Sequence, residues 1–227
     1  MSNASEQSPG GFGDRTTPSR RVIDWILAVL LIFLGLGITG IGGLLVSITD
    51  REWFEELVAE GTIESDIITE AELVDAMVAF SWWGGMGIVL AGVVMVLGGI
   101  AFGVARRRID RMDEGAETPT FVANALIGAA ITVLVSFIPL SGLLGGGVAG
   151  YLETADSWNG ALVGATAALV LAVPVAVAAV VLSIGLIIED LVILALGLLL
   201  GLMFTVAFSM GISAIGGAIG SYLHKRG

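Results

Sequence analysis

The chain has 227 residues, of which 56% are hydrophobic and only 14% are charged, and its formal net charge is −11. Soluble domains are about half apolar and about a quarter charged, so a lipid bilayer is the solvent that suits this composition. The acidic balance excludes the basic face that nucleic acid requires. Cysteine is absent, which excludes disulfides, thiol nucleophiles and cysteine-based metal sites.

The N-terminal part of the sequence predicts a tail followed by a membrane span. Residues 1–21 are rich in Ser, Gly, Pro and Thr, a composition typical of a disordered segment, here a cytoplasmic tail. Trp25 to Ile48 is uncharged and long enough to cross a bilayer, which takes about 20 apolar residues. No small-residue cleavage site follows, so this stretch is interpreted as a retained span rather than a removed signal.

An acidic loop, 49–75, follows the first span and holds ten Asp or Glu residues. We expect it to be extracellular. Two positions match the capping-box pattern, in which a Thr hydroxyl and a Glu carboxylate satisfy free amides at a helix start. Thr49 and Glu52 predict a short helix at the bilayer surface. Thr69 and Glu72 predict the start of the helix that becomes the second span.

The second span is predicted from Trp83 to Ala105 and is followed at once by Arg106–Arg108 and Arg111. A cluster of Arg at a span end is typical of the cytoplasmic side. Residues 22–111 are therefore predicted to form a two-helix transmembrane hairpin, and 112–120 a polar linker.

The next stretch, Phe121 to Leu152, contains no charge but is interrupted at Pro139. As one helix it would measure about 48 Å, against a hydrocarbon core of about 30 Å. It is either one overlong kinked helix or a hairpin that turns at Pro139. The hairpin reading gives a span from Phe121 to Ile138 and a short glycine-lined return from Ser141 to Leu152.

Two further spans complete the chain. Gly160 to Ile188 contains Pro174, which removes one backbone hydrogen bond and is expected to bend the helix. Leu191 to Leu223 follows a short acidic turn. With the preceding stretch, these spans make 121–227 a glycine-rich transmembrane domain of four segments.

The predicted fold is an all-α polytopic transmembrane bundle of six membrane segments, with Ser141–Leu152 as the short fourth one; the alternative is five. Six segments place both termini in the cytoplasm of a cell-membrane protein, with nine of the ten Lys and Arg residues inside and Arg51 outside. Five segments would leave seven inside. The positive-inside rule therefore favours six.

Glycines recur at helical spacing along these spans, and such glycines let helix backbones approach closely in a membrane. Gly145–Leu152 also aligns with Gly216–Leu223, glycine with glycine and Tyr-Leu with Tyr-Leu, either as a repeat or by coincidence. The predicted helix-packing residues are Gly99, Gly103, Gly142, Gly146, Gly150, Gly160, Gly164, Gly197, Gly201, Gly216, Gly217 and Gly220.

A resemblance rests on these same motifs. From about Phe121 onward, a span, a proline, GLLGGGVAGYL, a polar turn, NGALVGATAALVLAVP and a closing SAIGGAIGSYL succeed one another. This order resembles a haloarchaeal family of small glycine-rich multi-pass membrane proteins, catalogued only as a domain of unknown function. The resemblance covers the C-terminal half. It implies four helices there and supplies no activity and no catalytic residue.

Residues that could carry chemistry are few. Asp24 lies at the interface near Arg21, Glu189 and Asp190 read as a solvated turn, and His224 as an interface residue. The glycines match neither phosphate-binding pattern, and the acidic loop lacks the ligand spacing of an EF-hand. No catalytic, cofactor or metal residue is predicted, no cofactor is expected, and the protein is not expected to be an enzyme.

Three functional classes remain. A structural or partner-binding bundle is favoured, with the lipid bilayer and either a second copy or another membrane protein as partners. The alternative is a channel or transporter for a small solute, which broken helices at Pro139 and Pro174 would suit. Against it, no span holds a buried charge for an ion relay. A membrane enzyme ranks last.

Overall fold

A computed structural model describes residues 18–66, 68–112, 120–135, 140–153 and 156–226, which contain helices and no strand. Most of the predicted tail and linker lies outside these residues. The helices are α1 (Pro18–Ser47), α2 (Arg51–Ala59), α3 (Glu70–Met112), α4 (Thr120–Leu134), α5 (Ser141–Leu152), α6 (Ser157–Ile188) and α7 (Val192–His224).

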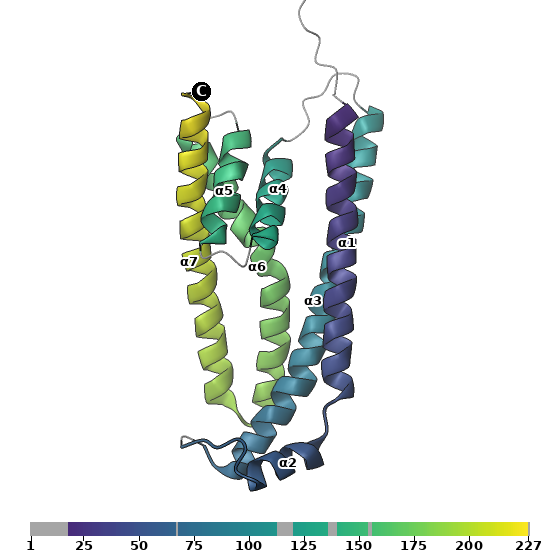
Figure 1. Cartoon of the computed structure of the whole chain (residues 1–227), viewed down its shortest axis with the longest axis vertical. Coiled ribbons are helices and arrows are strands. Elements are labelled where there is room, and N and C mark those ends of the chain that lie inside the picture. Colours follow the sequence, from purple (N-terminus) through teal and green to yellow (C-terminus); the bar gives the residue numbers. More distant parts are fainter. Residues whose placement is uncertain (1–17, 67, 113–119, 136–139, 154–155, 227) are drawn as a thin grey trace, which may run out of the picture.

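Four of these helices, α1, α3, α6 and α7, are long and apolar enough to cross a membrane by length and composition. They run up and down in an elongated bundle (Figure 1). The chain enters α1 and leaves α7 at the same end, called here the terminal end. The opposite end, called the α2 end, carries α2 and the turn between α6 and α7. The all-α membrane-type architecture predicted from the sequence is confirmed at this level.

The remaining pair, α4 and α5, forms a hairpin that reaches only partway along the bundle (Figure 1). α4 has 15 residues and α5 has 12, which give about 22 Å and 18 Å of helix. α6 and α7 have 32 and 33 residues, or about 48 Å each. Because α4 starts and α5 finishes at the terminal end, the hairpin turns back about halfway.

This hairpin decides between the two arrangements predicted for Phe121 to Leu152, one kinked helix or a hairpin. The kinked single helix is excluded, since α4 ends at Leu134 and α5 starts at Ser141 in the reverse direction; Pro139 itself lies outside the described residues. Six membrane segments are not confirmed. The predicted span from Phe121 to Ile138 is replaced by a helix too short to cross, because its chain turns back at mid-depth. Four long helices and one half-length hairpin remain.

The first two long helices pack backbone to backbone through glycines that the sequence analysis did not single out. A Cβ atom built on Gly35 would lie 2.7 Å from the carbonyl oxygen of Gly92, and one on Gly42 would lie 2.7 Å from that of Gly85. The Thr39 hydroxyl, between them, donates to the carbonyl of Gly35 at 2.8 Å. α1 and α3 therefore form a closely packed antiparallel pair.

α2 lies across the α2 end (Figure 1) and buries Phe54 and Val58 against Val74 of α3. Its N-cap is Asp50, whose carboxylate accepts from the amide of Glu52 at 3.0 Å. The predicted cap at Thr49 is therefore wrong by one residue. The Thr49 hydroxyl instead donates to a carbonyl of α1, where it closes the preceding helix.

The capping box predicted at the start of α3 is confirmed. The amide of Thr69 donates to the Glu72 carboxylate at 2.8 Å, and the amide of Glu72 donates to the Thr69 hydroxyl oxygen at 3.3 Å. The bonds that Thr69 donates from its amide and its hydroxyl lower the pKa of Glu72. Their contribution to stability is present above the ordinary pKa of the carboxyl and is lost as the pH falls through the lowered one.

α6 connects the α1–α3 pair to the rest of the bundle. The Trp83 side chain of α3 lies against Gly185, and Gly87 lies against the backbone of Ala178. Pro174 lies inside α6 without ending it. The two predicted domains therefore meet along a packed face rather than through the linker alone.

The half-depth hairpin generates a labelling prediction. In a cell membrane, Leu140→Cys at the hairpin tip should resist a bulky impermeant thiol reagent from outside, because the tip stops at mid-depth. Ser65→Cys, in the loop at the α2 end, should be labelled. The absence of native cysteine makes both readouts clean. Equal labelling at Leu140 and Ser65 would contradict the half-depth hairpin and favour a complete crossing.

Candidate functional site

The hairpin is held in place by a three-helix contact that we call the glycine node. Two α7 residues one turn apart form its centre, and each lies against glycines of both α5 and α6, four glycines in all. Any Cβ atom added on these four glycines would collide with the α7 backbone. The node consists of Ser213 and Gly217 on α7, Gly146 and Gly150 on α5, and Gly164 and Gly160 on α6.

A second row of contacts extends the node along the α5–α7 seam. Gly216 lies against the carbonyl of Leu143, and Gly220 against that of Gly147. In a membrane, where hydrocarbon surrounds both helices, such close packing and interhelical bonds stabilise association in place of the hydrophobic effect. α5 is therefore bound to α7 through backbone atoms over most of its length.

The other predicted packing glycines divide into two groups. Gly99 and Gly103 face Ala28 of α1: a Cβ atom built on Gly99 would lie 3.1 Å from the carbonyl oxygen of Ala28, and one built on Gly103 would lie 3.6 Å from its Cβ atom. A Cβ atom built on Gly142 would lie 3.0 Å from the Ser213 hydroxyl. In contrast, a Cβ built on Gly197 or Gly201 would meet no described atom of another helix within 4 Å.

Contrary to the prediction, Gly197 and Gly201 are therefore not packing positions among the described residues. They lie toward the α2 end of α7, where the neighbouring large side chains are exposed, Leu200 at 67% and Phe204 at 72%. A four-residue glycine spacing specifies a smooth helical face and does not specify a neighbour. Conversely, the α1–α3 contacts were missed although their signal was present, since Gly35 and Gly42 and their partners Gly85 and Gly92 share a spacing of seven.

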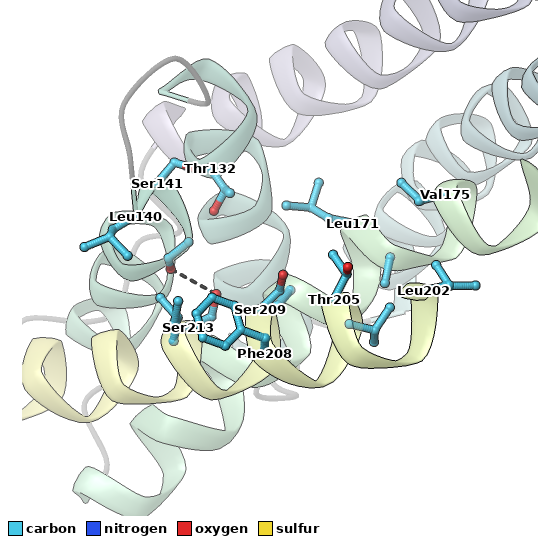
Figure 2. Close-up of a pocket in the computed structure, with 15 residues that line it drawn as sticks. Thr132, Leu140, Ser141, Leu171, Val175, Leu202, Thr205, Phe208, Ser209 and Ser213 are labelled. Atoms are coloured by element: carbon cyan, nitrogen blue, oxygen red, sulfur yellow. Dashed lines mark hydrogen bonds between the residues drawn. The ribbon is translucent and has the colours of Figure 1, made fainter. Parts of the chain in front are cut away.

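Directly beyond the tip of the hairpin lies a cavity of about 350 Å³, called here the hydroxyl cavity. Its wall comes from the hairpin, from α6 and from α7, and Figure 2 shows the lining side chains around the space. α6 contributes only apolar side chains. The polar part of the wall consists of five hydroxyl groups, those of Thr132, Ser141, Thr205, Ser209 and Ser213.

Two of the five hydroxyls are engaged within the protein. Ser213 donates to the carbonyl of Gly142 at 3.0 Å, the bond drawn in Figure 2, and so ties α7 to the first turn of α5. Thr132 donates to the carbonyl of Gly128 in its own helix at 2.9 Å. Within the described part of the chain, the other three hydroxyls, on Ser141, Thr205 and Ser209, form no hydrogen bond.

The backbone adds further polarity at this depth. Leu140 adopts a left-handed conformation with φ 66° and provides no side-chain cap for α5. The first amides of a helix have no partner inside it, and the positive end of the helix dipole lies there. The cavity wall thus offers hydroxyls and a helix start, without any charged or titratable side chain among its lining residues.

The charged residues considered in the sequence do not join this cavity. Glu189 ends α6 and is exposed, and Asp190 takes φ 59° in the turn. His224 lies edge-on to the Tyr151 ring, with 5.0 Å between ring centres. The side chain of Asp24 is outside the described ones. Among the described residues, no group of three or more His, Asp or Glu side chains could hold a metal ion.

The node yields a stability prediction with a matched control. Gly217→Ala places a methyl group into the backbone of Gly160, and overpacking of this kind costs about 1–3 kcal/mol. Gly201→Ala, on the same helix in open space, should be neutral or stabilise by up to about 1 kcal/mol through helix propensity. Thermal unfolding in detergent measures both. Two variants with equal midpoints would refute the close packing at the node.

The C-terminal part of the chain is similar to one known family. Residues 122–223 match the model of a family described as a family of unknown function, DUF5518. No curated protein and no solved structure matches the chain. The matched region contains almost all of the hairpin, α6 and nearly all of α7, and therefore both the glycine node and the hydroxyl cavity. The C-terminal part of this chain is thus similar to a family of unknown function, and its four helices, α4 to α7, form one glycine-packed unit.

Proposed function

We propose that this chain is an integral membrane protein that admits a small uncharged polar solute, of the size of water or glycerol, to the hydroxyl cavity and forms part of a passage for it. The observation that carries the proposal is the set of three hydroxyls without a hydrogen-bond partner in the described chain, Ser141, Thr205 and Ser209, in a cavity at mid-depth.

Hydrocarbon is a poor neighbour for such groups. Removing a hydroxyl from water without a hydrogen-bond partner costs up to about 1–3 kcal/mol when the group is fully buried. Ser141 and Ser209 are half-buried and Thr205 is exposed, so in a bilayer their hydroxyls meet either hydrocarbon or a polar occupant of the cavity. Interrupted helical backbone at membrane depth is tolerated where it is buried in protein or lines a water-filled cavity. Leu140 and Ser141, where α5 begins, line this cavity. Water or a polar solute in the cavity would satisfy both the hydroxyls and the start of α5.

A wall without charged side chains suits an uncharged solute. A charge inside the membrane is costly and is normally paired, and none of the lining residues is ionisable. The proposed passage includes no enzymatic step and no cofactor. Arg106–Arg108 and Arg111 near the terminal end support a cytoplasmic location of that end in the cell membrane, by the positive-inside rule.

Solute flux into proteoliposomes tests this proposal. We expect the protein to accelerate the shrinking or swelling of vesicles in an osmotic gradient of glycerol or of an impermeant osmolyte. Removing one hydroxyl that receives the solute, by Thr205→Val or Ser209→Ala, should lower the flux about fivefold, since a hydrogen bond contributes about 1 kcal/mol. Light scattering in a stopped-flow instrument measures the rate.

Thr166→Val is the matched control. Its hydroxyl donates to the carbonyl of Leu162 at 2.8 Å in its own helix and does not line the cavity. This variant should transport as the parent does. Absence of flux above protein-free vesicles for the parent, or equal losses in Thr205→Val and Thr166→Val, would refute passage through the hydroxyl cavity.

A partner-binding role is the second candidate, and one observation favours it. Toward the α2 end, α7 exposes Leu200 and Phe204 beside Gly201, whose Cβ position is open. Small residues allow close approach of a second helix in a membrane. This face would suit a second copy or another membrane protein in addition to lipid.

Cysteine cross-linking in membranes tests self-association through this face. If two copies meet there, Gly201→Cys should give a disulfide-linked dimer on mild oxidation, because the small residue would lie at the crossing. Gly37→Cys, equally open but on α1, is the control and should stay monomeric. A monomeric Gly201→Cys protein under the same oxidation would count against a second copy on α7.

A further inference from the structure

A second cavity, of about 380 Å³, lies between α1, α3, α4 and α6 and is called here the apolar cavity. It is formed by the N-terminal half of α1, the C-terminal half of α3, the middle of α6 and a face of α4 that does not include Thr132. All of its lining residues have hydrocarbon or thioether side chains or are glycine. Leu31, Gly98, Leu126 and Val170 represent the four helices in its wall.

This wall selects a hydrocarbon occupant. A water molecule in a cavity needs two to four polar partners, and the apolar cavity offers no polar side chain. An apolar cavity of about 150 Å³ holds benzene, with six carbons, so by proportion a cavity of 380 Å³ suits about 15 carbons. That is the scale of a lipid acyl chain, the hydrocarbon that a bilayer supplies at the highest concentration.

The position of the cavity in the bundle favours one leaflet. Its residues on α1 and α3 lie toward the terminal end, and α4 lies in the same half (Figure 1). α3 continues beyond the lining residue Phe102 for one turn and then reaches Arg106–Arg108. A chain seated in the cavity from the terminal side would therefore have its headgroup beside a basic run, which attracts anionic headgroups.

We infer that the apolar cavity is a binding site for the acyl chain of an anionic phospholipid from the leaflet at the terminal end. The lipid fills the space between α4 and the α1–α3 pair, where α1 and α4 scarcely contact one another. It stabilises the folded protein by mass action, because only the folded chain offers the site. This inference requires the membrane setting and does not depend on solute passage.

Gly98→Leu is the variant that tests the site. Gly98 lines the cavity, and a Cβ atom built on it meets no atom within 4 Å. A leucine at this position occupies the cavity without displacing a backbone. Gly43→Leu is the matched control, since Gly43 is equally open on α1 but does not line the cavity.

The measurement uses the full chain in detergent with palmitoyl-oleoyl phosphatidylglycerol as the probe and phosphatidylcholine of the same chains as its comparison. Native mass spectrometry should show one tightly bound phosphatidylglycerol per parent chain and per Gly43→Leu chain, with a raised melting temperature. Gly98→Leu should fold, bind this lipid at least tenfold more weakly and lose the lipid-dependent rise in melting temperature.

Two outcomes would overturn the inference. If Gly98→Leu keeps the bound phosphatidylglycerol and its stabilisation at the level of Gly43→Leu, the lipid does not occupy the apolar cavity. If phosphatidylcholine binds and stabilises the parent as well as phosphatidylglycerol does, the site does not select an anionic headgroup. Should Gly98→Leu fail to fold, Ala130→Leu, at another lining residue of α4, replaces it with the same expected result.

Discussion

The contact on which the rest of the structure depends is the meeting of three helix backbones at Ser213 and Gly217. A side chain larger than hydrogen on the facing glycines of α5 and α6 would separate the helices. The hairpin would then lose its close contacts with the α7 backbone. Because α5 is fixed there and is only 12 residues long, the hairpin ends before α6 and α7 do. The hydroxyl cavity is the space left beyond its tip, so a packing constraint in one half of the bundle creates a polar site at its middle.

The short helix α4 separates two environments of opposite character. Thr132 belongs to the wall of the hydroxyl cavity, whereas Leu126, Ala130 and Val133 belong to the wall of the apolar cavity. Leu171 of α6 contributes to both walls. A wall with hydroxyl groups and a wall of hydrocarbon thus lie on the same short helix. A change in the position of α4 would alter both cavities together.

Much of the architecture follows from the sequence, and the part that does not has a physical reason. Long uncharged stretches predict the four long helices, and the four-residue glycine spacing predicts the node, since these patterns are local. The depth of the hairpin is not local: an 18-residue apolar stretch before Pro139 is compatible with a crossing or with a half-length helix, and only its contacts with α7 decide. For the same reason Gly201 resembles Gly217 in sequence but not in surroundings. The hydroxyl cavity combines Thr132 with Ser209, which are brought together only by the fold.

The order of the node residues along the chain has a consequence for biosynthesis. α5 leaves the ribosome long before Ser213 and Gly217, its partners on α7. During that interval the hairpin is too short to form two spans and lacks its contacts with α7, and only α6 is available to pack against it. We expect α4 and α5 to stay at the lateral opening of the insertion machinery, or at the membrane surface, until α7 is made. Chains truncated before α7 would present an unseated glycine-rich hairpin, which makes the last helix the checkpoint for assembly of the whole C-terminal half.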